Sequence, residues 1–191
     1  MLFRSQLDLM IDATHPFAEQ MSRHAAFAAS ETGVPFFVLS RPAWQKTDGD
    51  RWTEAQSIVD GVARLGAHPR RVFAAIGRQE LAPLEAAPHH FYLVRSVDPI
   101  EPPLDVPDAR YICERGPFQA AAERKLLSGE KIDAILAKNS GGEASYAKIE
   151  AARKLGIEVV LVRRPKRGNA ETVENVLEAV SLAGQRLDSL K

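Results

Sequence analysis

The chain has 191 residues, of which 45% are hydrophobic and 26% charged, the balance of an ordinary globular protein rather than of a disordered one. Lysine plus arginine equals aspartate plus glutamate at 25 each, so no overall positive field draws the chain to nucleic acid or anionic lipid. No apolar run approaches the roughly 20 residues that span a bilayer, and the start lacks a secretory signal pattern. The single cysteine, Cys113, excludes an internal disulfide framework and favours a reducing, cytoplasmic location.

Short apolar runs rich in β-branched residues alternate with longer helical patterns along the chain. We predict strands at residues 9–11, 34–39, 71–76, 91–94, 111–113, 132–137 and 157–162. We predict helices at residues 16–30, 55–65, 79–87, 119–127, 143–155 and 170–187. The polar segment 41–54 is predicted to be a loop. Strands that alternate with helices predict parallel pairing in doubly wound α/β sheets.

The residues that follow each predicted strand are candidates for binding, because ligands of open α/β sheets lie beyond the carboxyl ends of the strands. Cations occupy most of these positions: Arg78, Arg95, Arg115, Lys138, Arg163 and Arg164. If the strands are parallel, these cations share one edge and favour a ligand with carboxylates or phosphates, which arginine binds in bidentate fashion. For any one of them, a solvated loop charge is the plainer interpretation.

The turn Lys138–Gly142 is the sharpest local feature. Its two glycines let backbone amides approach an anion, and a helix N-terminus is predicted to follow. Ser140 is a candidate N-cap, with Glu143 completing a capping box. A capped turn without a ligand is the alternative, and the sequence has no Walker A spacing.

Two further strand ends have a similar arrangement. Pro16 fits the first helical position after a cap at Thr14 or His15, and His15 is placed to bind a ligand or give it a proton, unless it only caps or packs. At Gly77–Glu80, a glycine and polar residues again follow a strand, and Arg78 projects over the edge or merely faces water. No histidine has zinc-ligand spacing with Cys113, so no metal site is predicted.

Taken together, these turns resemble the precorrin-6A and cobalt-precorrin-6A reductase family of corrin-ring biosynthesis. The matching segments occur in family order over nearly the whole chain: Asp12–Ala18, Arg41–Trp44, Asp50–Glu54, Gly77–Leu81, Arg95–Ser96, Arg115–Phe118, Lys138–Gly142 and Arg163–Pro165. The resemblance implies NADPH-dependent reduction of one double bond in the precorrin-6A or cobalt-precorrin-6A macrocycle, in cobalamin biosynthesis. It also implies two Rossmann-like halves with the ligands between them.

The resemblance also implies roles for individual residues. NADPH is expected at Lys138, Asn139, Ser140, Gly141, Gly142, Arg163 and Arg164. The tetrapyrrole, whose acetate and propionate side chains suit the strand-end cations, is expected at Asp12, Thr14, His15, Pro16, Phe17, Gly77, Arg78, Gln79, Arg95, Ser96, Arg115, Gly116 and Pro117. His15 is the candidate catalytic residue, as a proton donor or a hydrogen-bonding group. No nucleic-acid or membrane partner is expected, and the oligomeric state is left open.

One departure from the family pattern concerns the start of the chain. Family members begin with a strand, a Gly-Gly-Thr-type turn and further βα units before the segment that opens this sequence. We therefore expect residues 1–69 to be the remnant of an incomplete N-terminal Rossmann-like domain and residues 70–191 to form the C-terminal one. The chain would be a fragment of a longer protein, or a shortened protein that survives as a non-catalytic tetrapyrrole- or anion-binding domain. We expect self-association, because the first strand would have an open edge.

Overall fold

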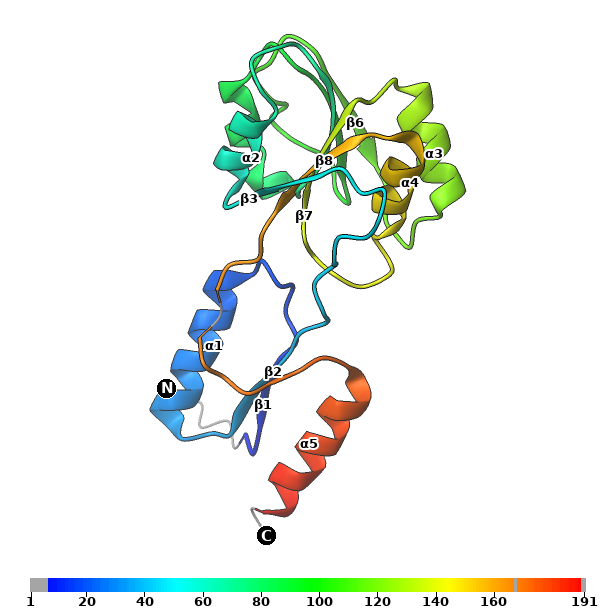
Figure 1. The fold of residues 1–191 in the computed structure, drawn as a ribbon. Coiled ribbons are helices and arrows are strands. Elements are labelled where there is room, and N and C mark those ends of the chain that lie inside the picture. Colours follow the sequence, from blue (N-terminus) through cyan, green and yellow to red (C-terminus); the bar gives the residue numbers. More distant parts are fainter. Residues whose placement is uncertain (1–6, 167, 190–191) are drawn as a thin grey trace. The chain divides into compact units, whose positions relative to one another are not determined.

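The computed structural model describes residues 7–166 and 168–189 (Figure 1). The chain divides into two compact units, a first unit of residues 1–42 and 164–191 and a second unit of residues 43–163. Residues 1–6 of the expected N-terminal domain lie outside the described residues. The units divide at Pro42 and Arg164 rather than at residue 69, because strand pairing keeps residues 52–55 with the second unit and returns the C-terminal segment to the first.

The second unit is built on a six-stranded, fully parallel sheet with the strand order β3-β8-β7-β4-β5-β6. The strands are β3 (Trp52–Ala55), β4 (Arg71–Ala75), β5 (Phe91–Ser96), β6 (Ala109–Cys113), β7 (Ala134–Lys138) and β8 (Glu158–Val162). The central strands are apolar on both faces, as strands covered on both sides must be. The prediction of an α/β fold with parallel sheets is therefore confirmed.

Helices cover both faces of this sheet (Figure 1). On one face lie α2 (Ile58–Arg64) and the 3-10 helices η1 (Arg78–Glu80) and η2 (Ala82–Ala86), with α2 packed on η2. On the other face α3 (Ala120–Gly129) packs against α4 (Ala147–Leu155). The core between these layers includes the fully buried side chains of Phe73, Leu93, Ile135, Ile149 and Leu161. Their burial supplies the main stabilisation of the unit.

The first unit contains a three-stranded parallel sheet with the order β1-β2-β9. The strands are β1 (Met10–Asp12), β2 (Phe36–Leu39) and β9 (Thr172–Val173), and the helices are α1 (Glu19–Thr32) and α5 (Val176–Asp188). α1 ends at Gly33, whose φ of 68° is left-handed and suits glycine. α5 begins after Asn175, whose side chain accepts a hydrogen bond from the Glu178 amide at 2.9 Å.

Four predicted helices begin at least three residues later than the sequence indicated. α2 begins at Ile58 rather than Ala55, because residues 52–55 pair with β8. α1 begins at Glu19 rather than Pro16, because residues 12–17 form a turn held by their own side chains. α4 begins at Ala147 rather than Glu143, after two glycines with positive φ. α5 begins at Val176 rather than Ala170, because residues 172–173 pair with β2 instead.

Two other segments also differ from the prediction. The helix expected over residues 79–87 is a pair of 3-10 turns with Pro83 at the start of the second, where an amide donor is missing. The loop expected over residues 41–54 contains the start of β3, a short polar strand at the sheet edge. Its Thr53 and Glu54 concealed it, because an edge strand does not need a continuous apolar run.

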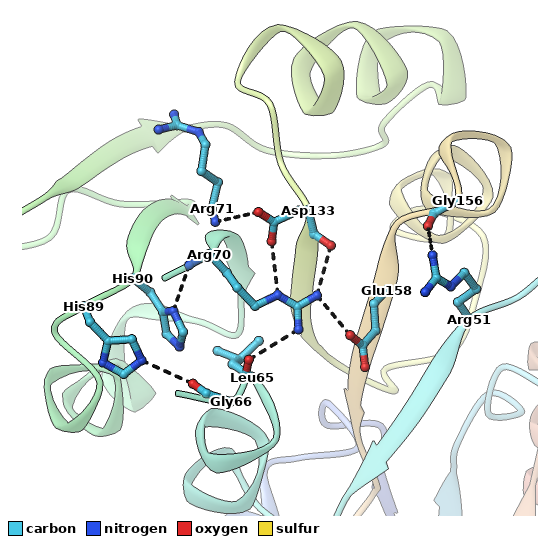
Figure 2. A network of polar contacts seen from close by, with 10 residues as sticks. All are labelled: Arg51, Leu65, Gly66, Arg70, Arg71, His89, His90, Asp133, Gly156 and Glu158. Carbon is cyan, nitrogen blue, oxygen red and sulfur yellow. Dashed lines mark hydrogen bonds and ion pairs between the residues drawn. The ribbon is translucent and has the colours of Figure 1, made fainter. Parts of the chain in front are cut away.

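The amino ends of the central strands are tied together by Arg70 (Figure 2). Its guanidinium donates to the carboxylates of Asp133 at 3.1 Å and Glu158 at 2.9 Å, and to the Leu65 carbonyl at 3.4 Å. Its backbone amide donates to Nδ1 of the buried His90 at 3.2 Å. This network joins β4, β7, β8 and the end of α2 at the amino ends of the strands.

Candidate functional site

The second unit has a change of direction between its neighbouring strands β4 and β7. After β4 the chain runs into η1 and η2 on the α2 face, whereas after β7 it runs into α4 on the α3 face. In open parallel sheets, ligands bind outside the carboxyl ends of the strands at such a switch point. The two turns at this point are 76–80 and 138–142, and an ion pair between Glu80 and Lys138 joins them. The sheet topology thus brings together two segments that the sequence separately identified as candidates.

Trp44 holds the second of these turns from a distant part of the chain. The Trp44 amide donates to Asn139 Oδ1 at 2.8 Å, and Asn139 Nδ2 donates back to the Trp44 carbonyl at 3.0 Å. The Trp44 indole N–H donates to the Gly142 carbonyl at 2.8 Å. No local sequence pattern reveals this role of Trp44, because its contact with Asn139 spans 95 positions.

The turn itself is shaped as an anion cradle. Gly141 and Gly142 have φ values of 65° and 73°, in the left-handed region that glycine adopts without strain. Their amides donate to no acceptor among residues 7–166 and 168–189, although Gly141 is buried. Buried amides are rarely left unbonded, and successive backbone amides in a turn can form an anion-binding concavity. The donor set of this turn therefore fits a phosphate group.

The capping box expected at this turn does not form. Residues 143–146 make a turn, and the first helical residue is Ala147. The Ser140 hydroxyl instead lies 3.3 Å from the Ser145 hydroxyl. Because α4 starts five residues beyond Gly142, Ser140 is not at a capping position.

The segment that carries Trp44 is fixed to α4 by a buried carboxylate. Asp50 accepts hydrogen bonds from Arg153 Nε at 2.8 Å and from the Thr47 amide at 2.8 Å. Burial alone would raise the pKa of Asp50, but the hydrogen bonds from Arg153 and Thr47 outweigh it and hold the pKa below its ordinary value. Arg153 also donates to the Tyr146 hydroxyl at 2.5 Å. Arg153 of α4 thus bonds both to Asp50, in the segment that carries Trp44, and to Tyr146, just before α4 begins.

Arg95, expected to bind substrate, is occupied by acidic side chains. Its guanidinium makes a bidentate pair with Glu123 at 3.0 and 2.8 Å, and Nε lies 3.3 Å from Glu114. The Arg95 side chain is only 6% exposed and lies over the rings of Phe73 and Phe118. These contacts give Arg95 a structural role at the end of β5. Ser96 follows it, with its hydroxyl donating to the Asp98 carbonyl at 2.5 Å.

The remaining expected cations differ in how they are bonded. Arg163 pairs with Glu54, and Arg164, in the first unit, donates to the carbonyls of Arg41 at 2.8 Å and Pro42 at 3.1 Å. Arg115 is exposed and is followed by a cis peptide bond between Gly116 and Pro117. Its side chain makes no hydrogen bond or ion pair with any residue that the structure describes.

Arg78 is also exposed and has no such partner among the described residues. Together with Gln79 it lines a hollow of about 520 Å³ in the second unit. The apolar lining residues are Leu81, between η1 and η2, and Ile100 and Leu104 from residues 97–108, the proline-rich loop between β5 and β6. Gly77, just before Arg78, has a φ of 97° and turns the chain away from β4. Arg78 is therefore an accessible cation in a hollow whose other lining residues are both apolar and acidic.

The first expected segment, at Asp12–Phe17, belongs to the first unit. Asp12 Oδ1 accepts hydrogen bonds from the Thr14 amide at 2.9 Å and the Thr14 hydroxyl at 2.6 Å. The Phe17 amide donates to His15 Nδ1 at 3.3 Å, so neither Thr14 nor His15 caps α1. Asp12 and Pro16 line a second hollow, of about 240 Å³, within the same unit. The expected site residues are thus divided between the two units.

Two classes of feature are absent from the part of the chain that is described. No group of three or more histidine, cysteine, aspartate or glutamate side chains there is arranged to hold a metal ion. Likewise, none of the described helices is long and apolar enough to cross a membrane.

Comparisons with known proteins agree on one family. The family model described as "Precorrin-6x reductase CbiJ/CobK" matches residues 1–182. A precorrin-6A reductase of Sinorhizobium sp is 53% identical over 173 residues, which are 91% of this chain and 66% of that protein. A precorrin-6A reductase of Rhodobacter capsulatus is 46% identical over 92% of this chain and 71% of its own length.

A solved structure, described as "CobK precorrin-6A reductase", has a TM-score of 0.92 and 42% sequence identity to this chain. The match covers 96% of this chain and 73% of that structure. A cobalt-precorrin-6A reductase of Priestia megaterium is more distant, at 29% identity over 82% of this chain. The chain therefore spans about two thirds to three quarters of the length of these relatives, and it belongs to the precorrin-6x reductase family.

Proposed function

We propose that this chain takes part in the NADPH-dependent reduction of one double bond in the macrocycle of precorrin-6A or cobalt-precorrin-6A, a step of cobalamin biosynthesis. Family membership supports the reaction class. The observation that carries the proposal is the switch point of the second unit. There an anion cradle and an arginine without a partner among the described residues follow neighbouring strands. The cradle would bind a phosphate-bearing reductant, and the arginine would bind a carboxylate-bearing ring.

The cofactor side of the proposal is the turn 138–142. The unbonded amides of Gly141 and Gly142 suit the phosphates of NADPH. The carboxamide of Asn139 is already bonded to Trp44, and this fixes the shape of the cradle before any ligand arrives. Arg163 and Arg164 would reach NADPH only by exchanging their present partners, Glu54 and the carbonyls of residues 41 and 42.

The substrate side of the proposal is the hollow beside Arg78. A carboxylate of the macrocycle would accept hydrogen bonds from the Arg78 guanidinium, while the ring edge would lie against Ile100 and Leu104. Glu85 lines the same hollow but accepts the Asp105 amide at 3.0 Å, which anchors the proline-rich loop. Glu101 also lines the hollow, so Arg78 is the one positive charge among its lining residues and is the group that would hold a carboxylate of the ring.

NADPH, held at residues 138–142, would supply a hydride with its two electrons to one carbon of the double bond. The neighbouring carbon then takes a proton, and His15 is the proposed donor or orienting group, with solvent as the alternative source. His15 Nδ1 accepts a hydrogen bond from the Phe17 amide at 3.3 Å, so Nε2 is the ring nitrogen that would donate to a ligand. The contribution of the chain is alignment of the two ligands and stabilisation of their negative charge.

Calorimetric titration of the full chain with NADPH, with NADH as the comparison, tests the proposal first. We expect selective NADPH binding, followed by NADPH oxidation that depends on precorrin-6A. A Gly142→Ala variant should lose cofactor binding, because a side chain at a φ of 73° strains the turn and displaces its amides. Gly156→Ala is the matched control, since Gly156 has a similar φ of 67° with open space around it. Binding of a porphyrin carboxylate without any NADPH binding would instead favour the non-catalytic tetrapyrrole-binding function.

A further inference from the structure

Lys148 is a buried cation that the proposed reaction does not yet use. It is the second residue of α4 and is 6% exposed. Its Nζ donates to the Ser145 carbonyl at 2.6 Å and lies 4.8 Å from the centre of a Trp44 ring. Trp44 bonds Gly142, and Ser145 contacts Ser140. Lys148 therefore contacts two residues that bond to the glycine turn.

We infer that Lys148 is a positioning residue for the anion cradle, and that its ammonium supplies the positive charge behind the amides of Gly141 and Gly142. The ligand class is a pyrophosphate group, such as that of a dinucleotide. The inference rests on the anion site of the proposed function and does not depend on reductase activity. In this role Lys148 acts through Trp44 and Ser145 rather than by touching the reacting atoms.

The surroundings of Lys148 explain why its charge is available to a ligand. An ammonium has three N–H donors, and the one acceptor described for Lys148 is the Ser145 carbonyl. The nearest carboxylate on α3 is Glu123, which is already paired in bidentate fashion with Arg95 of β5. Asp50, on the loop that carries Trp44, is likewise paired, with Arg153. The positive charge of Lys148 is thus not cancelled by a dedicated partner.

Burying an ammonium without a carboxylate partner is costly. The face of Trp44 offsets part of this cost, and a bound anion would offset more. Burial lowers the pKa of Lys148 to about 8, with Glu123 opposing the shift and Arg95 adding to it. Because an anion favours the charged form, bound pyrophosphate should raise the pKa of Lys148, and affinity should fall as pH rises through 8.

The test measures binding of inorganic pyrophosphate to the full chain by calorimetry between pH 6.5 and 9.5. The ratio of wild-type to Lys148→Met affinity should fall about tenfold from the low to the high end of this range. This is the effect expected if pyrophosphate raises the pKa of Lys148 by roughly one unit. Lys148→Met should bind about tenfold more weakly at pH 7 than the wild type. Lys148→Arg should still bind pyrophosphate. Its affinity should not show the fall near pH 8, because arginine stays charged.

Lys154→Met is the matched control, since Lys154 is exposed on the same helix. A carbon-13 NMR titration of the lysine side chains supplies a readout that needs no variant. The Lys148 signal should titrate near pH 8 in the free chain and at higher pH with pyrophosphate. Purely structural support of the turn would not move this titration.

Three results would overturn the inference. The first is a folded Lys148→Met variant that binds pyrophosphate with the affinity and pH profile of the wild type. The second is a Lys148 titration that pyrophosphate leaves unchanged, and the third is a wild type that binds no pyrophosphate. Failure of the proposed function looks different: Lys148-dependent pyrophosphate binding would persist, but precorrin-6A would cause no NADPH oxidation.

Discussion

Arginines lie at both ends of the strands in the six-stranded sheet. Those at the amino ends and those at the carboxyl ends, the amino and carboxyl edges of the sheet, differ in how they are bonded. At the amino edge, Arg70 donates to two carboxylates and two carbonyls, and each of these contacts joins elements of the fold (Figure 2). At the carboxyl edge, Arg78 is exposed beside a hollow and bonds none of the described residues. A saturated arginine stabilises the fold, whereas an arginine without protein partners is available to a ligand.

Arg95 shows that position on an edge is not sufficient to assign a role. It follows the carboxyl end of β5, as a binding residue should, yet its guanidinium is buried against Glu123. In its bonding it resembles Arg70 rather than Arg78. The comparison therefore predicts that changes near Arg95 and Arg70 affect stability, while changes at Arg78 affect binding.

The largest effect is expected from Glu123→Gln, which leaves the Arg95 charge buried and incompletely paired. Breaking one partner of a buried ion pair costs about 3–5 kcal/mol, so the free energy of unfolding should fall by this amount in urea denaturation. The exposed Glu143→Gln is the control and should change stability little. An unchanged urea midpoint in Glu123→Gln would show that Arg95 is not the structural cation described here.

Arg78→Ala should weaken binding of a water-soluble porphyrin carboxylate by about 10- to 100-fold, the loss of a charge-assisted hydrogen bond worth about 1.5–3 kcal/mol. The melting temperature should stay within one or two degrees of the wild-type value, because no described residue loses a partner. Arg124→Ala removes an exposed arginine from α3 and serves as the control. A large drop in melting temperature would instead make Arg78 structural and remove the contrast between the two edges.

Arg70→Met should lower the free energy of unfolding by about 1–2 kcal/mol, since the network is partly exposed and solvent screens its ion pairs. Denaturant unfolding measures this loss. Pyrophosphate binding should be unaffected, because Arg70 lies at the opposite end of the strands. Weaker pyrophosphate binding in a stable Arg70→Met variant would contradict the separation of the two edges.

The smallest effect is a loss of stability in mild acid that depends on His90. Burial lowers the pKa of His90, and the neighbouring charges of His89 and Arg70 lower it further. The unfolded chain therefore takes up a proton first, near pH 6.5. The contribution of His90 to stability is fully present above that pH. It is lost as pH falls from there through the lower folded-state pKa.

His90→Asn tests this decline by replacing Nδ1 with an amide oxygen that can still accept the Arg70 amide without titrating. Thermal unfolding between pH 5 and 7.5 should show a shallower pH dependence for His90→Asn than for the wild type. The exposed His68→Asn should keep the wild-type slope. Equal slopes for all three proteins would mean that His90 does not contribute to the pH dependence.

The sequence by itself determined the fold class and the position of most strand-end turns. Runs such as 157–162 are apolar because both faces are covered, and this local property predicts buried parallel strands. The glycines at 141 and 142 likewise indicated a turn that approaches an anion, and both have the positive φ that requires glycine. These features are encoded by neighbouring residues, so a local pattern is enough to find them.

The tertiary structure alone decided which residues of the candidate site are available. The bonds of Trp44 to Asn139 and of Arg95 to Glu123 join positions 95 and 28 residues apart, and Lys148 gained a role only through such contacts. Strand pairing also moved the division between units to residues 42 and 164. Because the partner of a charge and the neighbour of a strand are chosen across the whole chain, no local pattern specifies them.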